Sequence, residues 1–154
     1  LEILSGFALY SLAISGISAL DADTVWVSIN YISTGYAPFG LSYDAKVWRT
    51  DDGGASWSMK LHTTFPPHIN EIYAVDDQVA WAAGGSKFSY PYPAIFVTSN
   101  GGSTWDYRYL DFFGNPKYRM LDVWGADAVN GWAVYGQVAT PDGGVKRTCD
   151  GPNL

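Results

Sequence analysis

The sequence has a single cysteine and few basic residues. Because Cys149 is the only cysteine among 154 residues, the chain can form neither an internal disulfide nor a metal site built from several cysteines. Lysine and arginine number 9 against 15 aspartate and glutamate residues, which gives a net charge of −6. This acidic balance, with no basic cluster, argues against nucleic acid and against an anionic membrane surface as partners.

Several motifs that would announce a particular chemistry or location are also missing. Residues 1–20 are apolar but contain no basic residue and are interrupted by Ser and Gly, so we expect neither a signal peptide nor a transmembrane segment there. The chain begins with Leu, and we expect it to be a processed or excerpted product. It has no glycine-rich phosphate loop, nucleophile elbow or zinc motif. His62 and His68 lack a third ligand nearby in sequence, so no metal and no cofactor are predicted.

What the chain does have is aromatic residues, glycine and proline. Aromatics make up 16% of the residues, beside 17 Gly and 8 Pro. Strands favour aromatic side chains and tight turns favour Gly and Pro. This composition predicts an all-β fold.

Two sequence patterns recur about every 50 residues, which is typical of a repeat protein. The first is a turn followed by a strand with a central tryptophan, at Trp26, Trp81 and Trp132. The second reads V-W-R-T-D-D-G-G-A-S-W at 47–57 and I-F-V-T-S-N-G-G-S-T-W at 95–105. A partial third copy begins at 145 and contains Asp150 but neither the second glycine nor the tryptophan.

The second pattern describes a hairpin with its own hydrogen bonds. Its Asp or Asn can accept backbone N–H groups within the turn, its Thr adds a local bond, and its Gly supplies positive φ. The tryptophan would then cover an apolar seam. We assign a structural role to the following residues: Thr50, Asp52, Gly54, Trp57, Thr98, Asn100, Gly102, Trp105 and Asp150.

Each repeat predicts four short strands, and four-stranded units at this period are typical of β-propeller blades. In the second repeat we expect strands at about 69–75, 79–84, 94–98 and 103–110. The chain is thus predicted to be a propeller segment of about three four-stranded antiparallel blades. The boundaries are 1–11 for an outer closing strand and linker, 12–62 for blade 1, 63–111 for blade 2, and 112–154 for an incomplete blade 3.

The segment T-D-D-G-G-A-S-W at 50–57 resembles the Asp-box (BNR) repeat, and T-S-N-G-G-S-T-W at 98–105 departs from it only at Asn100. The phrases D-A-D-T-V-W-V and D-D-Q-V-A-W-A-A-G are similar to photosystem II stability/assembly-factor-like propellers. They are more similar still to large secreted propeller proteins of Bacteroidetes-type bacteria, many of which carry a type IX secretion sorting domain. The resemblance implies a secreted, cell-surface or extracellular setting. Since three blades do not close a ring, the rest of the propeller or other copies should complete it.

The resemblance also implies that the boxes lie on the face opposite the ligand site. That second face would carry the loops at 30–44 and 85–93, which are long for hairpins. Aromatic rings on exposed loops can stack on sugars or anchor a protein partner, whereas buried rings would only cap the blades. The candidate ligand-binding residues are Tyr31, Tyr36, Phe39, Tyr43, Phe88, Tyr90 and Tyr92.

No catalytic set can be assembled from the sequence. Sialidases, by the same resemblance, need three arginines with a Tyr–Glu pair and an Asp, and the chain has few Arg and two Glu, Glu2 and Glu71. A glucanase needs two carboxylates facing each other across a cleft, and nothing pairs Asp44 with Asp111. The sequence therefore favours a non-catalytic recognition, adhesion or scaffold module that binds a glycan or a protein. The alternative is part of a carbohydrate-active enzyme, sialidase-like or endoglucanase-like, whose catalytic residues lie outside this chain.

Overall fold

The computed structural model describes residues 9–34, 41–64, 68–85, 93–109, 118–137 and 143–148. These residues form antiparallel β-strands, which confirms the all-β class. The strands are β1 (Leu9–Ala19), β2 (Thr24–Thr34), β3 (Leu41–Asp51), β4 (Ser58–Thr63), β5 (Ile69–Ala74), β6 (Ala80–Gly84), β7 (Ala94–Thr98), β8 (Asp106–Tyr109), β9 (Tyr118–Gly125), β10 (Gly131–Gln137) and β11 (Gly143–Thr148).

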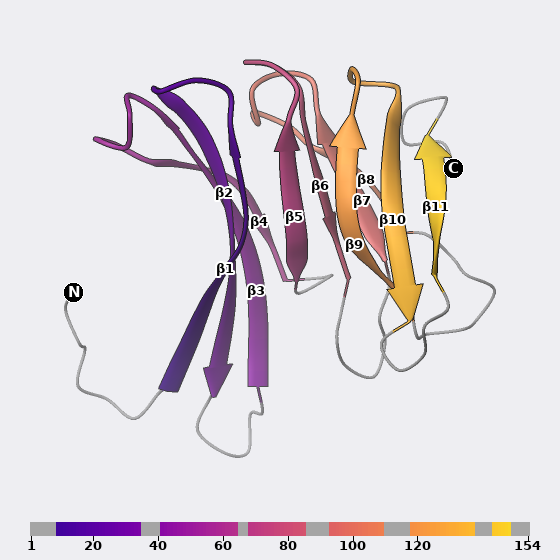
Figure 1. Ribbon diagram of the computed structural model, residues 1–154. Coiled ribbons are helices and arrows are strands. Elements are labelled where there is room, and N and C mark those ends of the chain that lie inside the picture. The colour runs from indigo at the N-terminus through magenta and orange to yellow at the C-terminus, as the bar shows by residue number, and fades with distance from the viewer. Residues whose placement is uncertain are drawn as a thin grey trace.

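Consecutive strands pair to form three sheets, which stand beside one another in chain order (Figure 1). The first sheet has the order β1-β2-β3-β4 and the second has the order β5-β6-β7-β8. The third sheet has three described strands, in the order β9-β10-β11. Two four-stranded antiparallel sheets are therefore confirmed, and the described strands do not close a ring.

Most predicted strand positions match the observed ones. The four strands of the second repeat lie within a few residues of their predicted bounds, although β8 begins at Asp106 rather than at 103 because residues 103–105 still belong to the box turn. β1 begins at Leu9, so three residues assigned to a linker are part of the first sheet. Residues 1–8 of the predicted closing strand and linker, and the third box residue Asp150, lie outside the described residues.

The central strands of the second sheet, β6 and β7, are buried on both of their faces. Every residue of β6 and β7 is buried, because alternate side chains pack against the first and the third sheet. One face contributes Ala82 and Phe96 to a core shared with Trp26 of the first sheet. The other face contributes Trp81 to a core shared with Val123 of the third. The repeated tryptophan thus points from each of these sheets toward the next one along the chain.

Polar side chains also link neighbouring sheets. Buried Asn30 of β2 donates from Nδ2 to the Ile69 carbonyl (2.8 Å) and accepts the Ile69 N–H at Oδ1 (2.9 Å), as a paired strand residue would. The Asn70 side chain donates to the Met120 carbonyl of β9 in the third sheet. Gly84 is required beside this junction, because a Cβ there would lie 2.0 Å from the His68 carbonyl oxygen.

The outward face of the first sheet is apolar and exposed. Ile14 and Ile17 of β1 pair with Ile29 and Val27 of β2, so their side chains share one face of the sheet, on the side away from the second sheet. Ile14 is 67% exposed and Ile17 is 66% exposed. The third sheet likewise exposes Trp124, at 46%. Among the described residues, nothing covers the outward face of the first sheet, whereas the Trp124 ring of the third sheet lies 5.7 Å from the Tyr73 ring of the second, between ring centres.

Candidate functional site

Most of the predicted aromatic ligand-binding residues fall outside the part of the chain that the structure describes, namely Tyr36, Phe39, Phe88, Tyr90 and Tyr92. Tyr43 lies in β3, with its backbone opposite Ile32 of β2. Tyr31 lies in β2 and is half-buried, and the Lys46 Nζ stands 4.6 Å from the centre of its ring. The structure therefore places Tyr31 and Tyr43 in one hairpin.

A small charged cluster stands beside Tyr31 on the outward face of the first sheet. Tyr31 pairs with Asp44, and Lys46 pairs with His62, so these four side chains share that face. The Asp44 Oδ2 lies 3.6 Å from the His62 Nε2. Asp44, one of the two carboxylates considered for a glucanase, thus has a histidine partner, and the other, Asp111, lies outside the described residues. Within the described ranges, no three His, Cys, Asp or Glu side chains are close enough together to hold a metal ion.

The first box is a self-contained hydrogen-bonded turn. The Thr50 hydroxyl accepts the Gly54 N–H (2.9 Å) and donates to Asp52 Oδ1 (2.7 Å). Asp52 also accepts the Ser56 N–H (2.8 Å) and the Ser56 hydroxyl (2.6 Å). Gly53 and Gly54 take positive φ, at 66° and 92°. Hydrogen bonds from the Ser56 hydroxyl, the Ser56 N–H and the Thr50 hydroxyl lower the pKa of Asp52 from 3.8 to about 2.

The second box repeats this geometry with an amide in place of the carboxylate. Asn100 Oδ1 accepts the Thr98 hydroxyl (3.0 Å) and the Thr104 N–H (2.9 Å), and the Gly102 N–H bonds to the Thr98 hydroxyl (2.9 Å). The two boxes differ in the direction of one hydrogen bond. In the second box the Asn100 amide donates to Thr104 Oγ1 (2.7 Å), whereas in the first box the Ser56 hydroxyl donates to Asp52. The Thr104 hydroxyl hydrogen is therefore not used in the turn.

Carboxylates also fix the turns between the first and second strands of all three sheets. Asp21 accepts the N–H groups of Asp23 and Thr24, at 2.8 and 2.7 Å. Asp76 accepts the N–H groups of Gln78 and Val79, at 2.7 Å each. In the third sheet, Asp127 accepts those of Val129 and Asn130 at the same distance. These bonds lower the pKa of Asp21, and bonds from Asn130 and Val129 lower the pKa of Asp127.

The boxes and the turns between the first and second strands lie at the same end of the strands. The Gly53 N–H donates to the Asp23 carbonyl (3.0 Å), and the Gly101 N–H donates to the Gln78 carbonyl (2.9 Å). In a meander of antiparallel strands, successive connections alternate between the two ends of the strands, so the connection between the second and third strands lies at the end opposite the boxes. The loops at 30–44 and 85–93 therefore begin and end on the side away from the boxes.

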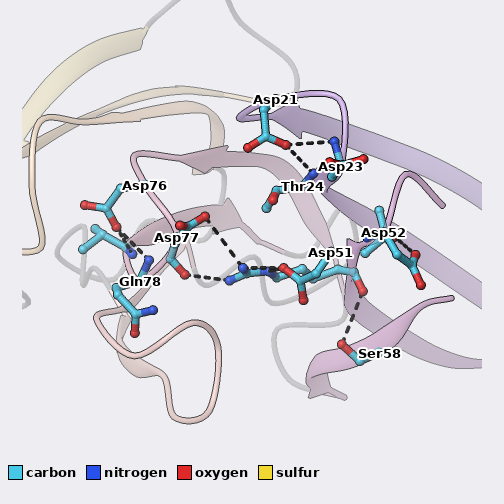
Figure 2. A network of polar contacts seen from close by, with 12 residues as sticks. Asp21, Asp23, Thr24, Asp51, Asp52, Ser58, Asp76, Asp77 and Gln78 are labelled. Atoms are coloured by element: carbon cyan, nitrogen blue, oxygen red, sulfur yellow. Dashed lines mark hydrogen bonds and ion pairs between the residues drawn. The ribbon is translucent and has the colours of Figure 1, made fainter. Parts of the chain in front are cut away.

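Arg49 joins the first two sheets at the end of the strands where the boxes lie. Figure 2 labels its partners Asp51 and Asp77, which come from the two different sheets. Its guanidinium donates to the Asp77 carbonyl (2.6 Å) and forms an ion pair with Asp51 (2.5 Å). It also lies over the Trp26 ring, 5.0 Å from the centre, and only 9% of the residue is exposed. Sequence reasoning placed Arg49 in the box strand but missed this role, since Asp77 belongs to another repeat.

The two box tryptophans differ in their surroundings. Trp105 donates its indole N–H to the Lys60 carbonyl of β4 (2.9 Å) and packs edge-on against Trp26, 6.0 Å between ring centres. Trp105 thus covers the seam to the preceding sheet, as expected from the sequence. Within the described part of the chain no sheet lies beside Trp57, which is 43% exposed and lines an apolar hollow together with Ile14 and Trp48.

Comparisons with models of known protein families, with curated proteins and with solved structures found no match to this chain. None of the described residues forms a helix that is long and apolar enough to cross a membrane.

Proposed function

We propose that this chain is a segment of an Asp-box β-propeller that acts, without catalysis, as an extracellular recognition, adhesion or scaffold module. The observation that carries the proposal is the stack of sheets. Successive sheets follow the same strand order, and equivalent tryptophans, Trp26 and Trp81, point to the next sheet and are fully buried. Such repetition at a fixed period is typical of propellers.

The turn carboxylates support a structural rather than a catalytic role. Asp21, Asp52, Asp76 and Asp127 each accept backbone N–H groups of their own turn. At Asp21, Asp52 and Asp127 those bonds lower the pKa, whereas a general acid needs a raised pKa. Glu71 has a pKa raised by burial, with Asp122 adding to the shift, but it accepts the Ile72 N–H within a sheet-to-sheet contact.

The two exposed apolar faces support completion of the ring by further sheets. The outward face of the first sheet carries Trp57 at the position equivalent to Trp105, on the face of the second sheet that packs on the first. Trp57 is exposed there, whereas Trp105 is half-buried. Exposed apolar area of this sort marks an interaction surface. We therefore assign these faces to the rest of the propeller or to other copies of the chain.

The proposal is tested by screening the complete ring on a glycan array and in pull-downs, with hydrolysis of each bound glycan followed in parallel. We expect binding without turnover, weakened by Tyr36→Ala and Tyr90→Ala in the proposed loop face. Hydrolysis of a bound glycan would instead favour the carbohydrate-active enzyme with catalytic residues outside this chain. The absence of any ligand would argue against recognition.

A further inference from the structure

An open groove of about 430 Å³ lies between the first two sheets, at their outermost strands β4 and β8. Leu61 and Phe96, which belong to the shared core, lie at its base. Trp105 and Tyr107 line one side, and Thr63 lines the other. The volume falls within the range of about 300–1,000 Å³ that is typical of small-molecule sites. The groove belongs to the seam between sheets and is separate from the proposed loop face.

The aromatic side of the groove is held in a fixed geometry. The indole N–H of Trp105 is bonded to the Lys60 carbonyl, and its ring is fixed edge-on by Trp26. The Tyr107 ring packs against Phe96, 6.1 Å between centres and tilted by 35°, yet Tyr107 remains 54% exposed. Rings fixed before a ligand arrives lose little entropy on binding.

The groove also presents hydroxyl groups, one of them with a defined direction. Thr63, Thr64, Ser103 and Thr104 all line it. Because the Asn100 amide donates to Thr104 Oγ1, the Thr104 hydroxyl hydrogen is left to donate to a ligand oxygen. An Asp at position 100 would instead accept that hydrogen, as Asp52 accepts the hydrogen of Ser56. The departure of the second box from the Asp-box pattern thus gives the groove a hydrogen-bond donor.

The lining is almost free of charge, in a chain whose net charge is −6. Among the described residues that line the groove, His62 and the Tyr107 phenol are the only titratable groups, and the His62 ring is paired with Asp44 on the outward face of the first sheet. No carboxylate, lysine or arginine of the described residues lines the groove to pair with a charged ligand. A ligand with apolar ring faces and many uncharged hydroxyls matches this surface.

We propose that this groove binds a neutral saccharide, stacked on Tyr107 and Trp105 and hydrogen-bonded by the Thr104 hydroxyl. Sugar rings have an apolar face that can pack on an aromatic ring, and their hydroxyls accept as well as donate hydrogen bonds. This proposal goes beyond the function proposed above, and it holds whether or not the loop face binds a ligand.

The test is calorimetric titration of the chain with neutral hexasaccharides of β-1,3-glucan, β-1,4-glucan, α-1,4-glucan and β-1,4-mannan, with oligogalacturonate as the anionic probe. We expect at least one neutral probe to bind. Tyr107→Ala should weaken that binding about tenfold or more, while Tyr107→Phe keeps the stacking ring and most of the affinity. If no neutral probe binds, or only the anionic probe does, the proposal is wrong.

Two further variants separate the groove from general effects on folding. Asn100→Asp keeps the box turn, as the first box shows, and should weaken binding about three- to tenfold by turning the Thr104 hydroxyl inward. Trp57→Ala removes an aromatic ring of similar exposure outside the groove and should leave the affinity unchanged. Equal effects of Trp57→Ala and Tyr107→Ala would overturn the assignment, and Tyr36→Ala tests the loop face separately.

Discussion

At the scale of single residues, side-chain hydrogen bonds to nearby backbone fix the turns of this protein. Asp21, Asp76 and Asp127 occupy equivalent positions and each accept two N–H groups at 2.7–2.8 Å. Asn30 bonds to backbone between two sheets instead: it accepts the Ile69 N–H and donates to the Ile69 carbonyl, as a neighbouring strand would. These bonds place short polar side chains where a turn or a seam needs them.

The lowered pKa of Asp52 predicts that the first box contributes to acid sensitivity. The pKa in the folded state, about 2, lies below the ordinary aspartate value of 3.8, so the stabilisation is complete above about pH 4 and is lost as the pH falls toward 2. Thermal midpoints measured between these pH values should fall less steeply for Asp52→Asn than for the unchanged chain. The matched control is Asn100→Asp, which should steepen the fall; equal slopes in all three proteins would contradict this prediction.

Asn30→Ala should lower the free energy of unfolding by about 2–3 kcal/mol, because it removes two buried hydrogen bonds and leaves the Ile69 N–H and carbonyl without them. Urea denaturation checks this. The control Asn130→Ala removes an exposed side-chain bond to Asp127 and should cost well under about 1 kcal/mol. A loss at Asn30 no larger than the loss at Asn130 would show that the inter-sheet bond is unimportant.

At the scale of elements, each sheet depends on its neighbour for burial. Every residue of β6 and β7 in the second sheet is buried. The third sheet leaves the space that the Trp81 ring occupies. A Cβ on Gly125 would lie 2.3 Å from the Trp81 ring, and the Trp81 indole N–H donates to the Asp127 carbonyl (2.8 Å). The tryptophan is therefore the main contact that holds one sheet against the next.

Trp81→Phe should destabilise the chain by about 2–4 kcal/mol, since it opens a cavity and removes the donor to the Asp127 carbonyl. Trp132→Phe changes the equivalent residue of the third sheet, which is only partly buried, and should cost less than half as much. Denaturant midpoints of the two variants provide the comparison. Equal losses would mean that Trp81 does not carry the contact between sheets.

Local spacing was enough to predict several elements and the chemistry of the boxes. The strand at 94–98 was predicted to the residue, and the Thr50–Asp52 and Thr98–Asn100 turns depend only on neighbours within four residues. The early start of β1 was missed, because its eleven residues include a bulge between Ile14 and Gly16 that disturbs the alternating pattern.

Contacts between repeats could not be predicted from spacing. The bond from Arg49 to Asp77 and the bond from Trp105 to Lys60 join residues 28 and 45 positions apart, in different sheets. The groove beside Tyr107 depends on how two sheets pack, which no local pattern encodes. Of the predicted loop face, the structure describes only Tyr31 and the backbone of Tyr43.

At the scale of the whole molecule, the three sheets leave two apolar faces exposed, one at each end of the stack (Figure 1). Within the stack, the Trp105 side of the second sheet covers the Trp26 side of the first. In the same manner, the exposed Trp57 side of the first sheet in one copy of the chain could cover the Trp132 side of the third sheet in another copy, so that the copies pair head to tail. This arrangement can continue from sheet to sheet until a ring closes.

The isolated chain should therefore self-associate through these faces as its concentration rises. Ile14→Lys places a charge on the outward face of the first sheet and should shift sedimentation toward the monomer. Because Ile14 is 67% exposed, we expect the thermal midpoint of the monomer to change little. A chain that remains monomeric at every concentration would contradict head-to-tail pairing of its copies.

If these sheets are consecutive blades of one ring, a crystal structure of the complete ring will show it. In that structure we expect Trp57 to be buried, with its indole N–H bonded to a main-chain carbonyl of the neighbouring sheet, as Trp105 is bonded to Lys60. A structure in which no ring forms, or in which Trp57 and Ile14 face solvent, would contradict it.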